Sequence, residues 1–392
     1  MIKYGEVAPS PPLAEAVVDL DAIAHNTRLL AGHTDSPMLA VVKADAFGHG
    51  FEAVTRTVLA AGATWLGVTS RAEALATRAA GFTAPILSWL HAPDEDFAPV
   101  VAADIDLSAA STEHLTGIAA GARRAGSPAK VHLKVDTGLS RSGATDRHWP
   151  ELVELARSLE VAGLLTVRGV WSHLANGEHP EHPSIAAQLH AFHRALRLAR
   201  DAGLTPTLVH LANSAALVGI PEAHFDLVRP GIALYGPEPV PERTIGLRAA
   251  MTLRTRVILV KRVAAGTGVS YGHDYTTTDE TTLALVPIGF ADGVPRCAGS
   301  QAEVWIRGRR CPIAGRVAMD QFVVDVGDLP VRTGDEVLVF GDGGRGEPTV
   351  DDWARWAGTN PHEIFTGIGA RVSRRYLPVR SRHTTEREHV NA

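Results

Sequence analysis

The sequence predicts an α/β protein in which an N-terminal (β/α)8 TIM-like barrel is followed by a mainly β domain. Over the first 235 residues, short runs rich in Val, Ile and Leu alternate with segments of helical periodicity, which is typical of a parallel sheet. This alternation stops at a proline cluster, Gly236–Pro241, which we interpret as a linker. We therefore expect a barrel domain over residues 1–240 and a β domain over 241–392.

Eight apolar runs in the first part are expected to be the barrel strands, and one more strand, near Ala16–Leu20, precedes them and can pack with the β domain. The runs lie near Met38–Val42, Trp65–Val68, Ile86–Trp89, Ile105–Ser108, Val131–Val135, Val167–Ser172, Leu208–Leu211 and Asp226–Val228. Eight β/α units in about 200 residues are the size of a compact barrel. A doubly wound open sheet is the alternative that this spacing leaves open.

Beyond the linker, the run Thr255–Val263 and the segment Glu303–Ile306 are predicted to be strands, because β-branched and aromatic residues dominate them. One helix, around Val350–Ala357, interrupts this β domain, and the charged tail from about Arg380 is expected to be frayed.

Composition excludes several classes of protein. The formal net charge of -5 and the hydrophobic fraction of 45% fit neither a disordered chain nor a basic nucleic-acid-binding domain. Two cysteines, Cys297 and Cys311, can form neither a disulfide framework nor a zinc site, so we expect buried reduced thiols. Neither a leader nor a long apolar stretch is apparent, which predicts a cytoplasmic protein.

Polar residues follow the predicted strands, where a barrel carries its chemistry. Lys43 ends the first run, so burial should lower its pKa and suit it to Schiff-base formation, although a lysine that merely extends from a strand end is the structural alternative. Lys134 could form an ion pair with Asp136, His173 could be a core histidine and Ser214 could be a helix N-cap.

The loops after the seventh and eighth runs form the usual phosphate site of such a barrel. They contain Asn213-Ser214 and Arg229-Pro230-Gly231-Ile232, in which Ser214 can donate its hydroxyl proton and Gly231 allows a close backbone approach. A lysine across the rim from a phosphate site points to pyridoxal phosphate as the cofactor.

Seven motifs in order resemble the alanine racemase family of fold-type III pyridoxal-phosphate enzymes, nearly from end to end. They are AVVKADAFGHG, HLKVDTGLSRSG, HLANSAA, FDLVRPGIALYG, GVSYG, VPIGFADGVPR and GRVAMDQFVVD. The resemblance implies a barrel domain followed by a β domain. It also implies a homodimer whose active sites are shared between the subunits.

The resemblance also assigns roles to individual residues. Lys43 would carry the cofactor and act as one of two catalytic bases, with Tyr271 of the partner subunit as the other, because racemisation needs proton transfer on two opposite faces of the substrate. His173 and Arg229 match the residues that support the tyrosine, and Arg229 would also donate a hydrogen bond to the pyridine nitrogen. Because guanidinium stays protonated, this would weaken the ring as an electron sink and disfavour side reactions.

Further residues match positions that bind cofactor or substrate in the family. Arg141 would contact the cofactor and the substrate carboxylate, Lys134 matches a lysine that is often carbamylated, and Met319 and Asp320 match residues that reach into the partner's site. The implied cofactor-binding residues are Lys43, Asn213, Ser214, Arg229, Gly231 and Ile232.

Several positions depart from the family pattern. Phe47 and Phe290 stand where tyrosines are usual, no tyrosine is found near Ala370, and His362-Glu363 replaces a Tyr-Glu pair. Each missing hydroxyl removes a hydrogen bond worth about 0.5–1.5 kcal/mol. We therefore expect an alanine racemase that supplies D-alanine for peptidoglycan. The alternatives are a racemase of another amino acid such as serine, or a pyridoxal-phosphate-binding protein without turnover.

Two further classes are less consistent with the residues. A fold-type III decarboxylase would carry a carboxylate at the pyridine nitrogen, where Arg229 stands. A barrel metal hydrolase would need ligands at the strand ends, whereas His179 and His182 lie in the polar stretch GEHPEHP, which predicts a solvated loop. We predict neither a metal site, nor nucleic-acid binding, nor membrane association.

Overall fold

The computed structural model describes residues 12–241 and 243–380, so the tail expected to fray lies almost wholly outside the described residues. The chain forms two compact units. We call the one that contains Ile23–Ala46 and Phe51–Leu247 the barrel unit. The other, the β unit, contains the segments up to Ala22, Phe47–Gly50 and the chain from Arg248 onward.

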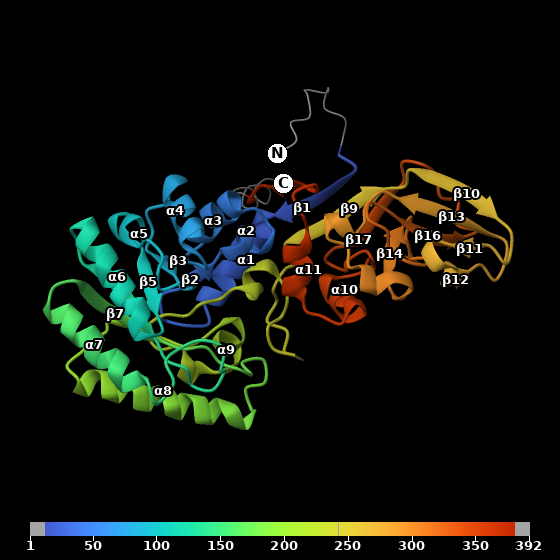
Figure 1. Ribbon diagram of the computed structural model, residues 1–392. Helices are drawn as coiled ribbons and strands as arrows, with labels where there is room; N and C mark the ends of the chain where they lie inside the picture. The colour runs from blue at the N-terminus through green and yellow to red at the C-terminus, as the bar shows by residue number, and fades with distance from the viewer. Residues whose placement is uncertain (1–11, 242, 381–392) are drawn as a thin grey trace, which may run out of the picture. The chain divides into compact units, whose positions relative to one another are not determined.

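The barrel unit contains a parallel sheet in the order β2-β3-β4-β5-β6-β7-β8 (Figure 1). Its strands are β2 (Leu39–Val41), β3 (Trp65–Val68), β4 (Ile86–Ser88), β5 (Asp106–Ala109), β6 (Ala129–Lys134), β7 (Leu165–Trp171) and β8 (Leu208–His210). Nearly every residue in these strands is buried, because helices cover the outer face of the sheet and side chains fill the inside. The predicted barrel architecture is confirmed, with seven of the eight runs as strands.

The eighth run, predicted at Asp226–Val228, forms no regular strand. It instead makes isolated parallel bridges from Val228 to Met38 and from Arg229 to Asn213. The amide of Leu39 donates a hydrogen bond of 2.8 Å to the carbonyl of Val228. This short segment therefore connects the two edges of the seven-stranded sheet.

Helices follow the strands, as the alternating pattern predicts (Figure 1). They are α1 (Leu20–Ala31), α2 (Lys43–Phe47), α3 (Phe51–Ala60), α4 (Arg71–Ala79), α5 (Ala98–Ala102), α6 (Thr112–Ala125), α7 (Trp149–Val161), α8 (Pro183–Asp201) and α9 (Ser214–Gly219), with 3-10 turns η1 (Pro221–Ala223) and η2 (Ile232–Tyr235). Helix α4 begins with a capping box, in which the Ser70 hydroxyl accepts from the Glu73 amide and the Glu73 carboxylate accepts from the Ser70 amide.

The β unit contains a six-stranded sheet in the order β15-β14-β17-β9-β1-β18, a three-stranded sheet β10-β13-β16 and a pair β11-β12. The strands are β1 (Ala14–Asp19), β9 (Met251–Arg256), β10 (Leu259–Val263), β11 (Gly268–Val269), β12 (Tyr275–Thr276), β13 (Thr281–Val286), β14 (Glu303–Ile306), β15 (Arg309–Pro312), β16 (Phe322–Gly327), β17 (Glu336–Phe340) and β18 (Ser373–Leu377). The first strand, β1, pairs antiparallel with β9 and parallel with β18.

The prediction of a single strand over Thr255–Val263 is wrong. The run is split between β9 and β10, which belong to different sheets. At the break, the amide of Val257 donates to the carbonyl of Asp335, whereas the next amide, that of Ile258, donates to Leu285. The run looks continuous in the sequence because β-propensity does not record which neighbour a strand pairs with.

The β unit also contains a helix that we did not predict. Besides the predicted α10 (Val350–Ala357), α11 covers Pro361–Gly367. Asn360 caps α11 by accepting the amide of Glu363, and proline occupies the first turn, so a start signal was present in the sequence. The expectation for the cysteines holds for Cys311, which is buried, but is wrong for Cys297, which is exposed.

Candidate active site

The ends of the parallel strands gather predicted site residues at one rim of the barrel unit. Lys43 follows β2, Lys134 is the last residue of β6, and His173 comes two residues after β7. Asn213 and Ser214 follow β8, and Arg229 lies in the segment that closes the sheet. Because all strands run in the same direction, their carboxyl ends meet at this rim.

Lys43 begins a turn with left-handed backbone geometry. The four residues Ala44–Phe47 have φ angles of 52° to 54°, although none is glycine. Each such residue costs about 1–2 kcal/mol. The Glu73 carboxylate opposes this strain by accepting a 2.8 Å hydrogen bond from the Ala44 amide, and the Asp45 carboxylate accepts one of 2.8 Å from Phe51.

The surroundings of Lys43 favour its neutral form. Burial and the positive charge of Arg141 lower the pKa of Lys43, while the negative charge of Glu73 opposes them. The amine Nζ also lies 5.9 Å from the centre of the Trp89 ring. A lowered amine pKa is what nucleophilic attack on a carbonyl requires, because only the unprotonated amine reacts.

The pKa of Lys134 is also strongly lowered. Burial and the charges of Arg229 and Arg141 lower the pKa of Lys134 to about 8. Its Nζ lies 4.4 Å from the centre of the Trp171 ring. The alternative of an ion pair with Asp136 is wrong, because that carboxylate accepts the amides of Gly138 and Ser140, and no salt bridge joins it to Lys134 in the described chain. The nearby negative charge of Asp136 only raises the pKa.

Arg229 is held from several directions. Its NH1 group lies 3.0 Å from Nδ1 of His210, and its NH2 group donates to the carbonyls of Ser172 at 2.8 Å and Leu211 at 3.1 Å. Among the residues that the structure describes, no group accepts a hydrogen bond from its Nε. Burial lowers the pKa of Arg229 to about 9, so the guanidinium stays charged at neutral pH.

His173 lies in the same electrostatic field. Burial and the charges of Arg229 and Arg141 lower the pKa of His173 to about 3. The imidazole is therefore neutral at physiological pH and can accept a hydrogen bond. This perturbation by site cations favours a site residue over the alternative of an isolated core histidine.

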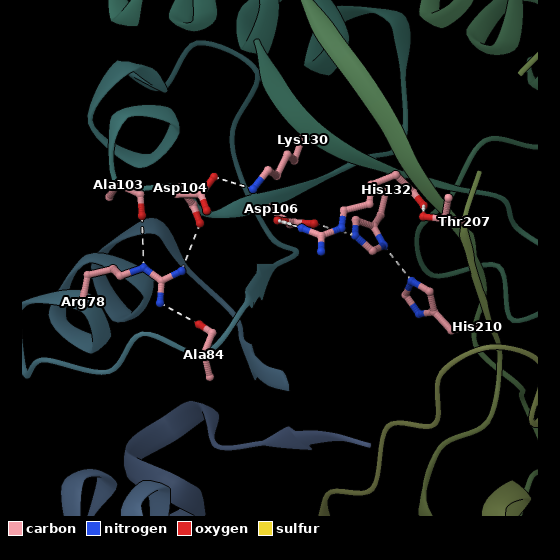
Figure 2. A network of polar contacts seen from close by, with 10 residues as sticks. Arg78, Ala84, Ala103, Asp104, Asp106, Lys130, His132, Thr207 and His210 are labelled. Carbon is pink, nitrogen blue, oxygen red and sulfur yellow. Dashed lines mark hydrogen bonds and ion pairs between the residues drawn. The ribbon is translucent and has the colours of Figure 1, made fainter. Parts of the chain in front are cut away.

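Arg229 contacts His210, which begins a series of buried polar contacts; Figure 2 shows this series from His210 through His132 to Asp106. His210 Nε2 lies 2.8 Å from His132 Nδ1, and His132 Nε2 lies 3.0 Å from a carboxylate oxygen of Asp106. Both histidines are 0% exposed, and the Trp171 ring stacks on His210. Although His132 and His210 open two of the quoted motifs, sequence analysis gave them no role. The available signal was a histidine within or at the end of an apolar strand, His132 in β6 and His210 at the end of β8.

Hydrogen bonds connect the loops that form the predicted phosphate site. Asn213 caps α9 by accepting the amide of Ala216, so the alternative of Ser214 as the N-cap is wrong. The Ser214 hydroxyl accepts the amides of Gly231 at 2.8 Å and Ala233 at 3.4 Å. The hydroxyl proton of Ser214 is thereby left to donate, next to the first residue of η2, Ile232.

Arg141 is an exposed residue of the barrel unit, whereas three further predicted residues lie on the β unit and are all exposed. Tyr271, in the turn η3 (Tyr271–His273), is 70% exposed, and Met319 is 56% exposed. Asp320 accepts a 2.7 Å hydrogen bond from Arg371. Exposed apolar surface of this kind is common at protein interfaces.

Two positions that depart from the family pattern contact each other. Phe47, which is 4% exposed, packs its ring 5.6 Å from that of His362. Phe290 lies beside the Met319 segment, because its amide donates to Ala318 and the next amide donates to Met319. The described residues contain no cluster of His, Cys, Asp or Glu that could hold a metal ion.

Comparisons with known proteins agree over most of the chain. Family models for the alanine racemase N-terminal and C-terminal domains match residues 18–239 and 250–376. An alanine racemase of Frankia casuarinae is 56% identical over 367 residues, which are 92% of this chain and 96% of that protein.

Solved structures agree as well. Alanine racemase from the D-cycloserine-producing Streptomyces lavendulae has a TM-score of 0.92 at 47% identity, and the match covers 94% of this chain and 98% of that one. An alanine racemase from Bartonella henselae with covalently bound pyridoxal phosphate has a TM-score of 0.85 at 31% identity, covering 94% and 100%.

Proposed function

The chain belongs to the alanine racemase family, and from this premise we propose that it interconverts L- and D-alanine with pyridoxal phosphate held at the rim of the barrel unit. Family membership makes the chain an enzyme, an isomerase. The proposal rests on three residues that lie at one rim of the barrel unit. Lys43 has a lowered pKa, Arg229 is held through His210, and the Ser214 hydroxyl accepts a backbone amide and keeps its own proton to donate.

The residues present fit pyridoxal phosphate. Lys43 offers a partly desolvated amine for covalent attachment. The hydroxyl of Ser214, with the backbone of Gly231 and Ile232 and the capped turn at Asn213, forms a neutral hydrogen-bonding site suited to a phosphate. When bound, the cofactor would supply an electron-withdrawing ring that makes the substrate Cα proton acidic.

Arg229 would orient that ring and limit its electron demand. Because His210 and two backbone carbonyls take three of its five N–H donors, Nε–H and one N–H of NH1 remain, and we assign Nε–H to the pyridine nitrogen. A guanidinium with a pKa of about 9 does not give up this proton at neutral pH. The site thereby favours return of the proton to Cα over side reactions.

Substrate binding and proton transfer fall to residues of both units. Arg141, an exposed cation whose charge acts on Lys43, Lys134 and His173, would bind the substrate carboxylate. Lys43 would move the proton on one face. Tyr271 would move it on the other, supplied by a second copy of the chain, and its exposed position supports this assignment.

Met319 and Asp320 would approach the site of the second copy with Tyr271. Lys134, with its pKa of about 8, has the unprotonated fraction that carbamylation requires and would then pair with Arg141.

We assign the protein to the cytoplasm, where its product would supply D-alanine for peptidoglycan. No helix among the described residues is long and apolar enough to cross a membrane.

The proposal is tested with purified protein, added pyridoxal phosphate and each L-amino acid separately in D₂O, by following deuterium uptake at Cα and formation of the D-enantiomer. We expect both processes to be fast and confined mainly to alanine. A preference for serine would indicate that Phe47 and Phe290 have redirected the site. Cofactor binding without exchange of any amino acid would contradict the proposal.

A further inference from the structure

A carboxylate far from the rim stands at the end of the buried chain of contacts that reaches Arg229. Asp106, at the start of β5, is 1% exposed, and its two oxygens accept from His132 at 3.0 Å and from Arg168 at 3.2 Å (Figure 2). His132 contacts His210, and His210 contacts Arg229. The only partly exposed member is Arg168, whose side chain is 28% exposed.

The two ends of this chain fix the direction of every hydrogen bond in it. Arg229 can only donate, so Nδ1 of His210 must be an unprotonated acceptor. Burial and the charge of Arg229 lower the pKa of His210, so this ring is neutral and carries its proton on Nε2. That proton points to His132 Nδ1, and the remaining proton of His132, on Nε2, is donated to Asp106.

We propose that Asp106 is a positioning residue for Arg229. By accepting the Nε2 proton of His132, it keeps both imidazoles in tautomers that present a lone pair to NH1 of Arg229 and leave Nε–H as the donor facing the site. The contact of Arg229 with the cofactor rests on the proposed function, whereas the tautomers of the two histidines follow from the hydrogen bonds alone.

The reversed tautomers would break the site. If His132 carried its proton on Nδ1, His210 would have to carry its own on Nδ1 as well, and two donors would face each other 3.0 Å apart at Arg229. The guanidinium would then lose one of the contacts that commit NH1 and NH2, and its Nε would no longer be held in one orientation. The Trp171 ring lies 14° from parallel to the His210 ring and restricts the tilt of its plane.

Two substitutions separate the acceptor role of Asp106 from its charge and its volume. Asp106→Asn keeps one acceptor oxygen for His132 while Arg168, being partly exposed, can turn to solvent. Asp106→Leu keeps a similar volume but offers no acceptor. Asp104→Asn is the matched control, since this carboxylate lies two positions earlier, is 70% exposed and pairs with Lys130 instead.

The first readout is the ¹⁵N NMR spectrum of histidine-labelled protein without cofactor, which reports the protonated nitrogen of each ring. We expect neutral His132 and His210, both protonated on Nε2, in the wild type, Asp104→Asn and Asp106→Asn. Asp106→Leu should lose this single state. A protonated Nδ1 on His210, or a doubly protonated His132, in the wild type would overturn the proposal even if Asp106→Leu fails to fold.

The second readout is the Kd for pyridoxal phosphate by fluorescence titration, with circular dichroism as a check on folding. We expect about tenfold weaker binding for Asp106→Leu and less than threefold change for Asp106→Asn. Equal loss in both variants would assign the effect to the charge of Asp106, and no loss in either would show that Asp106 does not position Arg229. Either result would overturn the proposal. Absence of racemisation with the expected tautomers and Kd values would refute the proposed function alone.

Discussion

At the scale of the residue, the environment of Lys43 changes an ordinary lysine into a nucleophile. Its stem follows a buried strand, its amine lies near Trp89, and Arg141 adds a like charge. Burial and the charge of Arg141 disfavour the ammonium form, whereas the carboxylate of Glu73 and the face of the Trp89 ring favour it and limit the fall in pKa. The order of residues showed a lysine at a strand end, but its pKa depends on groups brought near it by folding.

Replacement of Lys43 by alanine should therefore remove covalent attachment and turnover together. Without the amine, borohydride reduction should no longer fix pyridoxal phosphate to the chain, and racemisation should fall by at least about 10³-fold. Mass spectrometry and a chiral assay measure the two effects. Lys130→Ala, at an exposed lysine that pairs with Asp104, is the matched control. Racemisation at wild-type rate in Lys43→Ala would remove Lys43 from the central role.

At the scale of the element, helix α4 and the turn after Lys43 share one carboxylate. Glu73 caps α4 through Oε2, which accepts the amides of Thr69 and Ser70, while Oε1 accepts the amide of Ala44. The sequence S-x-x-E predicts the capping box alone. That the same glutamate also supports a left-handed turn between two other elements follows only from the placement of β2 beside β3.

The two functions of Glu73 can be separated by comparing Glu73→Gln with Ser70→Ala. Ser70→Ala removes the N-cap hydroxyl and should weaken the cap of α4 by about 1 kcal/mol, whereas Glu73→Gln keeps one acceptor oxygen for the capping box, so only Ser70→Ala should clearly lower the urea midpoint. Only Glu73→Gln removes the negative charge that raises the pKa of Lys43, so only this variant should shift that pKa further down.

The pH dependence of Lys43 modification by an amine-reactive reagent, quantified by mass spectrometry, measures the shift. Identical profiles for Glu73→Gln, Ser70→Ala and the wild type would show that Glu73 acts on α4 only.

In two other segments, the strands with which a run pairs decide where a strand begins and ends, and the local sequence pattern does not. The Thr255–Val263 run has uniform β-propensity, yet β9 pairs with β1 and β17 while β10 pairs with β13. The Asp226–Val228 run has the same propensity but forms only bridges. In both cases long-range hydrogen bonds, not residue types, set the limits of the strand.

At the scale of the whole molecule, buried neutral histidines make stability depend on pH. The pKa of His173 is about 3 and that of His210 is well below its usual value, whereas an unfolded histidine titrates near 6.5. Below pH 6.5 the unfolded chain binds these protons and the folded chain does not, so acidification favours unfolding. Lys134, with a pKa of about 8, is protonated in both states throughout this range.

We therefore expect the free energy of unfolding to fall between pH 6.5 and pH 5, by about 1.6 kcal/mol through His173 and further in the same direction through His210. Urea denaturation followed by tryptophan fluorescence at several pH values gives this quantity. His173→Gln, which cannot be protonated, should lose the part of the dependence due to His173, about 1.6 kcal/mol, and keep the part due to His210. A urea midpoint that stays constant from pH 7 to pH 5 would contradict this account.

The proposed sharing of the site between two copies belongs to the same scale. Mixing Lys43→Ala with Tyr271→Phe chains should restore activity, because a hybrid dimer would contain one site with both intact residues. With random exchange, half of the dimers are hybrids and each has one intact site, so about a quarter of wild-type activity is expected. A chiral assay after exchange, checked by native mass spectrometry, measures it. No recovery in proven hybrids would place both residues in one chain.

The sequence was sufficient for the alternation of strands and helices in the barrel unit, the barrel class and the positions of Lys43, Lys134 and His173 at strand ends, because hydrophobic periodicity is a local property. Tertiary structure alone decided the buried chain behind Arg229. His132 and His210 are 78 residues apart, and His132 and Asp106 are 26 apart. Which imidazole nitrogen carries a proton depends on such distant partners and on their desolvation, and no local pattern encodes either.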